Sequence, residues 1–305
     1  MKRELRSKGL LWGLMAMAAG GLQAQDDEGY IPSRKGVEFA VNIGVYRGNH
    51  QSASSFFIGD GYWELGDNTA GLMSIEERLG VDQPSSPVWS QVLNNMGILA
   101  DEYRYMEYPL GMTYSPGTLM GLQTLLFLNP ESAFVLHVDA VNGLKSVGGF
   151  NVVASDVDWG MGSENRRTYG IFSEEDRLQL SLGYRTAAYI VDQASWVFEV
   201  GGTLLATRLV ENYVRIENQN YQLFTGQIGN QFVGATSALV GTGFGAYGAV
   251  GLELMFEEGG NIEVQLRVSK DEVVMGNYSE RLWHGALVLS WVIPPQLGNF
   301  VRAKF

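Results

Sequence analysis

Cysteine is absent from the sequence, and charged residues are scarce. Without cysteine the chain has no disulfide, thiolate metal ligand, cysteine nucleophile or lipid-modified N-terminal cysteine. Charged residues make up 18% of the chain, whereas soluble domains usually contain about 25%. The net charge of −12 makes nucleic acid an unsuitable partner, because its phosphates are also negative. Glycine, at 39 residues, and aromatic side chains, at 11%, are plentiful and favour a β-rich protein.

After its N-terminus the chain also lacks an apolar run long enough for a membrane-spanning helix. Four basic residues precede a short apolar run at 9–19, and Leu22-Gln-Ala24 supplies small residues for cleavage. We therefore expect residues 1–24 to be a secretory signal peptide and residues 25–35 to be a periplasmic N-terminal segment. An exported chain without cysteine fits a bacterial envelope better than a disulfide-bonded secreted protein.

The rest of the sequence alternates between apolar and polar residues. A period of two predicts β-strands with one apolar face. The alternating segments lie at residues 37–46, 110–128, 134–140, 178–190, 196–206, 244–256, 262–268 and 283–293. The segment at 110–128 keeps one phase through Pro116-Gly117. The length of 305 residues would suit two domains, but this pattern predicts a single body of eight strands.

The links between these segments are short and long in turn. Short links lie at 129–132, 191–194 and 257–260, and long links lie at 50–107, 146–175, 211–237 and 271–281. Short turns at one end and long loops at the other are typical of outer-membrane barrels. Helices are expected only at 75–79 and 88–96, inside the first long link.

The distribution of charge separates a membrane barrel from a soluble β-sandwich or lipocalin, which also alternates. The polar face of the strands is rich in charged residues, at a density that a soluble core would not tolerate. Aromatic residues flank the apolar bands, as interfacial girdles do. We therefore predict an all-β fold, an eight-stranded antiparallel transmembrane up-and-down β-barrel at 36–293 with long extracellular loops. A short tail at 294–305 follows it.

In these features the chain resembles the small Gram-negative outer-membrane barrels of the OmpA, OmpX and OmpW type. The Ala24-Gln25 cleavage site and the glycine-aromatic strands resemble outer-membrane proteins of the Bacteroidota. Such barrels end on a strand whose last residue is aromatic; here the chain ends in Phe305, but Pro294-Pro295 stop the last strand first. The resemblance implies localisation in the outer membrane of a Gram-negative bacterium.

The interior of an eight-stranded barrel is filled by side chains or by one small ligand. We expect an interior network of ionisable residues, either as a structural plug or as a narrow gated lumen. Its members are Glu38, His137, Asp139, Arg185, Glu199, Glu253, Glu263 and Arg267.

Three cations alternate in step with the apolar, lipid-facing residues and lie at the outer ends of strands. Arg47, Arg208 and Lys270 are predicted to contact lipopolysaccharide phosphates, because long side chains can extend to the membrane surface. The alternative is that each strand has already ended at these residues.

The first long loop is the main candidate for a partner surface. Loops beyond about 15 residues are uncommon unless functional or disordered, and large aromatics argue for a packed cap or a binding surface. The aromatic candidates are Phe56, Phe57, Tyr62, Trp63 and Trp89. Asp60, Glu64 and Asp67 could hold Ca²⁺, but their spacing matches no EF-hand, and we expect no metal or cofactor.

Some barrels that resemble this chain in size are lipid A-modifying enzymes with serine and histidine near the outer surface. His50, His284 and Ser54 are the corresponding candidates here, but no motif fixes a serine and no third group is defined. We expect no enzyme. The prediction is a structural or interaction protein that presents acidic, aromatic-rich loops to an envelope partner for secretion, assembly or uptake. The alternatives are a narrow channel or carrier for small or hydrophobic molecules, and a lipid A-modifying enzyme.

Overall fold

The computed structural model describes most of the chain. The described residues are 34, 36–55, 62–65, 69–72, 75–81, 85–155, 165–191, 193–223, 227–228, 231–232, 240–256, 260–275 and 278–293. The predicted signal peptide at 1–24, the segment at 25–33 and the tail at 294–305 lie outside them. In the described part of the chain, no helix is long and apolar enough to cross a membrane.

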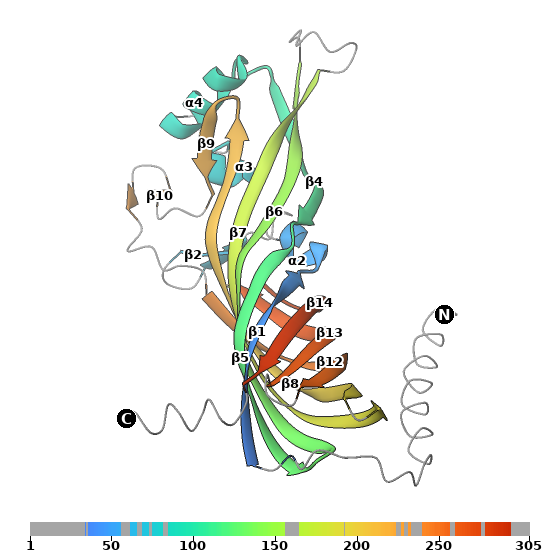
Figure 1. Cartoon of the computed structure of the whole chain (residues 1–305). Coiled ribbons are helices and arrows are strands. Elements are labelled where there is room, and N and C mark those ends of the chain that lie inside the picture. The colour runs from blue at the N-terminus through green and yellow to red at the C-terminus, as the bar shows by residue number, and fades with distance from the viewer. Residues whose placement is uncertain are drawn as a thin grey trace, which may run out of the picture.

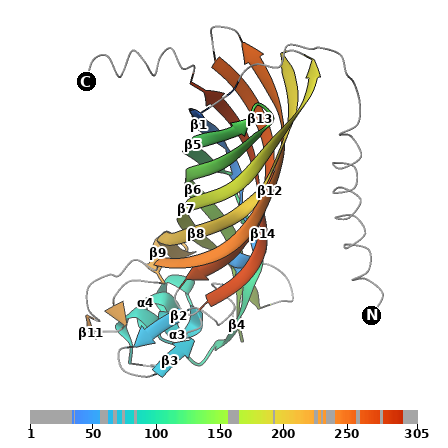
Figure 2. The same ribbon diagram turned by 90° about the horizontal axis from the view of Figure 1, so that it is seen from below.

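The strands form one antiparallel sheet that closes on itself as a barrel (Figures 1 and 2). Each strand of the ring pairs with the next, and the last, β14, pairs with the first, β1. The ring consists of β1 (Gly36–Arg47), β5 (Gly117–Asn129), β6 (Ser132–Ala154), β7 (Arg166–Val191), β8 (Ala194–Ile216), β12 (Val240–Phe256), β13 (Gly260–Met275) and β14 (Tyr278–Val292). Each predicted alternating segment falls on strand, although the one at 110–128 is divided between two strands and the last one ends at Val292. Closure leaves the ring without a free edge.

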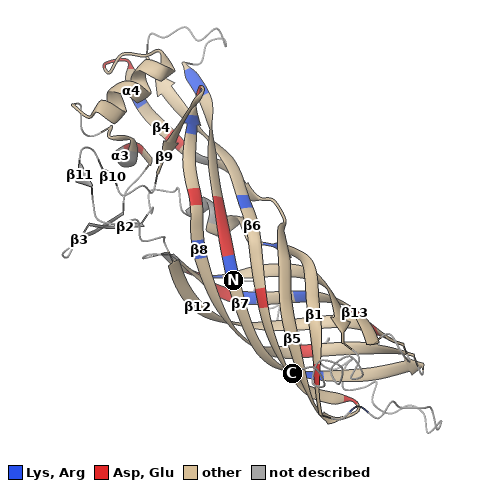
Figure 3. Ribbon diagram, turned by 60° about the vertical axis from the view of Figure 1, so that its left-hand side comes forward, with Lys and Arg blue, Asp and Glu red and all other residues tan. Residues whose placement is uncertain are grey.

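The barrel has an apolar outer face and a polar inner face. Phe39, Leu122 and Leu182 are 56%, 62% and 64% exposed, whereas Arg185 and Glu253 are buried inside. Charged positions are few along the barrel strands (Figure 3). This distribution is the reverse of a soluble protein and agrees with the orientation predicted from the alternation.

Several strands continue beyond the barrel, so parts of the predicted loops are strands. β6 and β7 remain paired up to Val153 and Arg166, and the link between β13 and β14 is only residues 276–277. β8 turns back into β9 (Gln219–Gln222). The expected long links at 146–175 and 271–281 are therefore mainly strand, and the link at 211–237 begins with a hairpin. That link also contains the short pair β10 (Gln227–Ile228) and β11 (Gln231–Phe232).

The prediction of one uninterrupted strand at 110–128 was wrong. The chain forms β4 (Tyr103–Tyr114) and then β5, separated by Ser115-Pro116, and β4 pairs with β6 through two register shifts near Gly111. Gly111 has φ +58°, a left-handed conformation that suits glycine at a bulge. Met112 and Tyr114 consequently point inward, whereas Met120 on β5 points outward.

Above the barrel, β4, β6, β7, β8 and β9 form an open sheet that helices cover on one face; we call this unit the cap (Figure 1). Helices α3 (Ile75–Leu79) and α4 (Pro87–Met96) confirm the two helices expected from the sequence. The Ser86 side chain accepts from the Trp89 amide at the start of α4, and Gly97 ends the helix with φ 71°. The expectation of only these two helices was wrong, because the first long link also contains a third helix, α2 (His50–Ser55). It contains in addition the hairpin of β2 (Tyr62–Leu65) and β3 (Thr69–Leu72).

An apolar core fills the cap and continues into the upper part of the barrel, where it includes Leu119, Leu205 and Val288. The buried face of α4, with Trp89, Val92, Leu93 and Met96, belongs to the same cluster as inward residues of the sheet. These sheet residues include Met106, Phe150, Val152, Ile171, Val214 and Ile216. Burial of this surface stabilises the extension independently of lipid.

Candidate functional site

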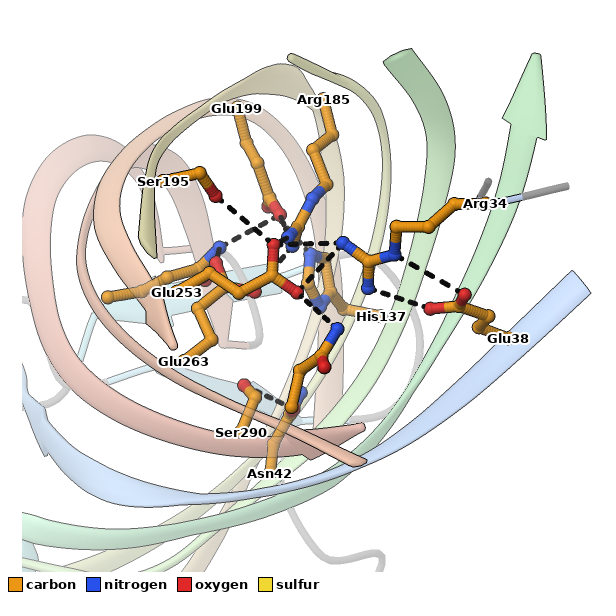
Figure 4. A network of polar contacts seen from close by, with 12 residues as sticks. Arg34, Glu38, Asn42, His137, Arg185, Ser195, Glu199, Glu253, Glu263 and Ser290 are labelled. Atoms are coloured by element: carbon orange, nitrogen blue, oxygen red, sulfur yellow. Dashed lines mark hydrogen bonds and ion pairs between the residues drawn. The ribbon is translucent and has the colours of Figure 1, made fainter. Parts of the chain in front are cut away.

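The lower half of the lumen is filled by a buried ion network centred on Arg185 (Figure 4). Its guanidinium lies 2.9 Å from Glu253 and 3.6 Å from Glu199, and it also bonds Glu263. β7 supplies the arginine, and β8, β12 and β13 supply the three carboxylates. Because a buried charge is tolerated only when it is paired and hydrogen-bonded, the four side chains depend on one another.

Arg267 and His137 extend this network across the lumen. Arg267 lies 2.6 Å from Asp139, and its other nitrogen lies 3.3 Å from His137 Nδ1. His137 Nε2 lies 2.9 Å from Glu199. This geometry fits a ring that donates from Nε2 to the carboxylate and presents Nδ1 as an acceptor to the guanidinium. The arrangement therefore joins the Arg185 and Arg267 clusters through one histidine.

Arg34 completes the network at the base of the barrel and was not predicted. It lies just before β1, in the segment expected to be periplasmic, yet it is only 6% exposed. Its guanidinium bonds Glu38 at 2.8 Å and Glu253 at 2.9 Å. The structure thus joins all the predicted interior residues in one connected set, with Arg34 as the link to Glu38. Arg34 precedes the first alternating segment, so the alternation could not place it inside the barrel. Its charge was the only signal in the sequence.

Neutral donors satisfy carboxylate oxygens that the arginines do not reach. Gln265 donates to Glu199 at 2.8 Å, Asn261 to Glu253 at 3.0 Å, and Asn42 to Asp139 at 3.0 Å. These amides reduce the cost of burying the excess carboxylates. Alternation placed Asn42 and Gln265 on the inner face, but their role depends on contacts across strands.

A second polar cluster lies higher in the lumen, around Arg177. The guanidinium of Arg177 contacts Glu175 at 3.0 Å, the Tyr46 hydroxyl at 3.2 Å and His284 Nδ1 at 3.4 Å. Tyr114 donates to Glu175, and Ser52 donates to Tyr114 at 3.1 Å. Arg177 and Arg185 are both almost fully buried, so charged side chains cross the lumen at two heights.

Helix α2 closes a seam in the wall at the upper cluster. The pairing of β1 with β14 ends at Arg47 and Gly285, and above that point α2 contacts both β14 and β4. His50 Nδ1 accepts from the Tyr114 amide at 3.3 Å, and the Asn49 amide donates to His284 Nδ1 at 3.3 Å. Side chains therefore replace ladder hydrogen bonds at this seam.

Among the described side chains, neither His50 nor His284 forms a hydrogen bond with a candidate catalytic serine. His50 and His284 each accept from a backbone amide across the seam. Ser54 lies on α2, but its side chain is outside the described part. The neighbouring Ser52 is buried, and its hydroxyl lies 2.9 Å from the Asn49 carbonyl and near the Tyr114 hydroxyl, not beside a histidine.

The three outer cations lie on the outer surface near the top of the ring. Arg208 pairs with Asp176 at 2.7 Å, and the Lys270 ammonium lies 5.5 Å from the centre of the Trp283 ring. Arg47 is exposed opposite Gly285. β8 and β13 continue beyond Arg208 and Lys270, so the alternative that each strand has ended applies only to Arg47.

The aromatic and acidic candidates of the first long link are only partly described. Phe56, Phe57, Asp60 and Asp67 lie outside the described residues, and the side chains of Tyr62, Trp63 and Glu64 on β2 are also not described. Trp89 is 4% exposed and packs edge-on against Tyr103, with ring centres 4.9 Å apart. Its assignment to a partner surface was therefore wrong, because α4 turns this ring into the cap core. Among the described residues, no group of three or more His, Asp and Glu is placed to hold a metal ion.

The chain was compared with known proteins. No family model matches the sequence, and no curated protein matches it. Among solved structures, the outer membrane protein OprG from Pseudomonas aeruginosa is similar at 8% sequence identity and a TM-score of 0.35. The match covers 86% of this chain and 95% of OprG.

Proposed function

We propose that the chain is an eight-stranded up-and-down barrel of a Gram-negative outer membrane, and that it holds its folded cap outside the cell as a surface for an envelope partner. The observation that carries this proposal is a cap with a helix-packed apolar core above a barrel whose lumen is crossed by ion networks. Such a barrel would hold the cap in a fixed position, and its filled lumen would not act as a wide pore.

The apolar outer face supports the membrane placement. Outward residues such as Phe39, Leu182 and Val200 are more than half exposed, and water would penalise this surface. A closed barrel satisfies all backbone hydrogen bonds within hydrocarbon. Short connections such as Pro130-Glu131 lie at the end opposite the cap, as periplasmic turns do.

Exposed apolar side chains on the cap support a role in binding. Leu99 is 65% exposed directly after α4, and Tyr105 on the edge strand β4 is 47% exposed. Such residues are typical anchors of protein interfaces. The partner would be another envelope protein, in secretion, assembly or nutrient uptake.

Site-specific photo-crosslinking in native membranes tests this function. A photoreactive residue at Leu99 or Tyr105 is expected to form a discrete adduct with one protein, whereas the same residue at the exposed turn residue Glu131 should not form that adduct. The adduct must also disappear when the cap is unfolded by the α4 variant described below. Labelling of lipid or of many proteins at Leu99 and Tyr105 would contradict a specific partner surface.

A narrow carrier is a second candidate, favoured by unpartnered polar atoms in the lumen. Among the described residues, the atoms without a hydrogen-bond partner include both side-chain ends of Gln123, Nε2 of Gln179 and of His284, and the hydroxyls of Ser181 and Thr207. Because such groups cost about 1–3 kcal/mol each when unsatisfied, the lumen suits water or a small polar guest. The seam at α2 would then be the route of entry.

A further inference from the structure

Outside the lumen, the outer face of the cap carries an arginine held by two stacked aromatic rings. Phe172 on β7 pairs across the sheet with Tyr213 on β8, with ring centres 5.1 Å apart and planes 20° from parallel. The Arg215 guanidinium lies 5.0 Å from the centre of the Phe172 ring. Its Nε donates to Asn220 Oδ1 at 3.0 Å. The rings and the amide together fix the plane of the guanidinium.

Within the described residues, Arg215 has no carboxylate partner. The neighbouring arginines Arg167 and Arg208 both form ion pairs, with Glu217 and Asp176. Arg215 thus keeps its terminal N–H groups available, although acidic residues outnumber basic ones by 33 to 21 in the chain. A fixed guanidinium with free N–H groups is suited to bidentate recognition of an anion.

The guanidinium borders an open recess of about 240 Å³. The recess is lined by Arg167, Thr168, Tyr169, Gly170, Phe172, Arg215 and Glu217. Gly170 makes room for the Phe172 ring, since a Cβ there would lie 2.7 Å from that ring. The volume is smaller than that of sites for drug-sized ligands and suits one small molecule.

The far wall of the recess is polar and fixed. Arg167 pairs with Glu217 at 2.6 Å, and Glu217 has φ 51°, the one positive φ among the described non-glycine residues. Such a conformation costs about 1–3 kcal/mol and is common at functional sites. This wall offers both donors and acceptors to hydroxyl groups.

The position of the recess determines which anion can reach it. Arg215 lies seven residues beyond Arg208 on β8, or roughly 20 Å along a strand, so lipid headgroups at the proposed membrane rim are too distant. One free guanidinium matches a single carboxylate better than a doubly charged phosphate. The mixed aromatic and polar lining matches a ring that carries several hydroxyl groups.

We propose that this recess binds the carboxylate-bearing sugar unit of an acidic glycan. Arg215 receives the carboxylate, the edge of Phe172 contacts the sugar ring, and the Arg167–Glu217 pair bonds its hydroxyl groups. The proposed membrane placement is used here only to exclude lipid headgroups. Binding of a soluble sugar by the purified chain does not depend on it, so the two proposals can fail separately.

The test is titration of the full chain in detergent micelles with sodium glucuronate, followed by calorimetry or saturation-transfer NMR. Glucose, acetate and glucose 6-phosphate are the comparison probes. Arg215→Gln should weaken glucuronate binding on the order of 10-fold, because a charge-assisted pair is lost. Gly170→Ala should weaken it as well, because the added Cβ would displace the Phe172 ring that borders the recess. Arg104→Gln, at an exposed arginine on β4, is the matched control and should bind like the parent chain.

Each outcome decides the proposal. Saturable glucuronate binding that both recess variants weaken, with weaker binding of the other probes, supports it. Equal binding of acetate would reduce the recess to a general anion site, and tighter binding of glucose 6-phosphate would make it a phosphate site. Either result overturns the proposal, as does glucuronate binding that is absent or unaffected by Arg215→Gln. The mobility shift of the folded barrel on unheated gels verifies that each variant is folded.

Discussion

Arg185 shows how a single residue can decide whether the lumen is stable. Its guanidinium is 1% exposed and faces Glu199, Glu253 and Glu263. Removing one partner from a buried ion cluster is far more costly than removing an exposed pair, because uncompensated charges stay behind.

We predict that Arg185→Met destabilises the barrel by about 3–5 kcal/mol, since buried Glu263 would lose its arginine and Glu199 and Glu253 would each lose one of their partners. The measurement is urea unfolding followed by the gel mobility of the folded barrel. Arg104→Met, at an exposed arginine, should change stability by less than about 0.5 kcal/mol. Adding Glu253→Gln and Glu263→Gln to Arg185→Met should restore part of the loss. An Arg185→Met barrel as stable as the parent would contradict a structural role for the network.

The inner positions of the network could be predicted from the sequence, but its connections could not. Alternation alone assigns residues such as Glu199 and Arg267 to the inner face. It says nothing about which residue meets which across the lumen, because those contacts depend on the stagger of strands that are far apart in sequence. Arg34 was missed for a different reason: it lies before β1, outside any strand, so alternation does not place it.

At the scale of elements, β6 changes its environment without changing its sequence pattern. Phe134 and Val138 point to the exposed outer face of the barrel, whereas Phe150 and Val152, also at even positions, point into the cap core. A register shift near Gly143, which has φ 66°, lies between them and turns the strand over by one residue. A similar shift occurs on β8 opposite Glu174 and Glu175.

These bulges explain why the barrel strands could be predicted and the cap could not. The alternation of hydrophobicity shows which residues of a strand share a face. It does not show whether that face points into the barrel or out of it. The bulges reverse that side at the level where the apolar side chains change from the exposed outer face of the barrel to the core beneath α3 and α4. Glycine at 143 marked the position, but only the cross-strand pairing identifies it as a bulge.

Helix α4 provides a test of whether the cap folds as a separate unit. We predict that Val92→Asp, at a fully buried position, unfolds the cap and leaves the barrel intact, because an unpaired carboxylate cannot be buried in an apolar core. Limited proteolysis should then cleave the cap, while the barrel keeps its mobility shift on unheated gels. Asn94→Asp, at an exposed position on the same helix, should resist cleavage like the parent chain. Loss of the barrel together with the cap would show that the two are one cooperative unit.

The outer cations give a second prediction for the strands. Replacing Arg47, Arg208 and Lys270 with Ala is expected to lower the lipopolysaccharide that co-purifies with the barrel, because all three lie on its outer surface where phosphates would be bound. Phosphate analysis of the purified protein measures the effect. The matched control replaces Arg104, Lys145 and Arg166, three exposed cations of the cap. Equal lipid in both triple variants would leave the outer cations without this role.

At the scale of the whole molecule, two layers of buried charge divide the lumen. The lower layer surrounds Arg185, and the upper layer surrounds Arg177 beneath α2. An ion crossing the barrel would have to displace both guanidinium groups from their carboxylates, and each displacement costs several kcal/mol. The two layers therefore act in series, and opening either one alone leaves the path closed.

Planar-bilayer recordings can test this arrangement and separate the two candidate functions. We predict that the parent chain inserts without a steady open channel. Arg177→Ala should also remain silent, because the lower layer is intact, and Arg185→Ala should remain silent because the upper layer is intact. The double variant should conduct, provided that gel mobility shows a folded barrel. A steady channel in the parent chain would contradict the closed platform and favour the carrier. Conductance in one single variant alone would mean that the corresponding layer is the only barrier to ions.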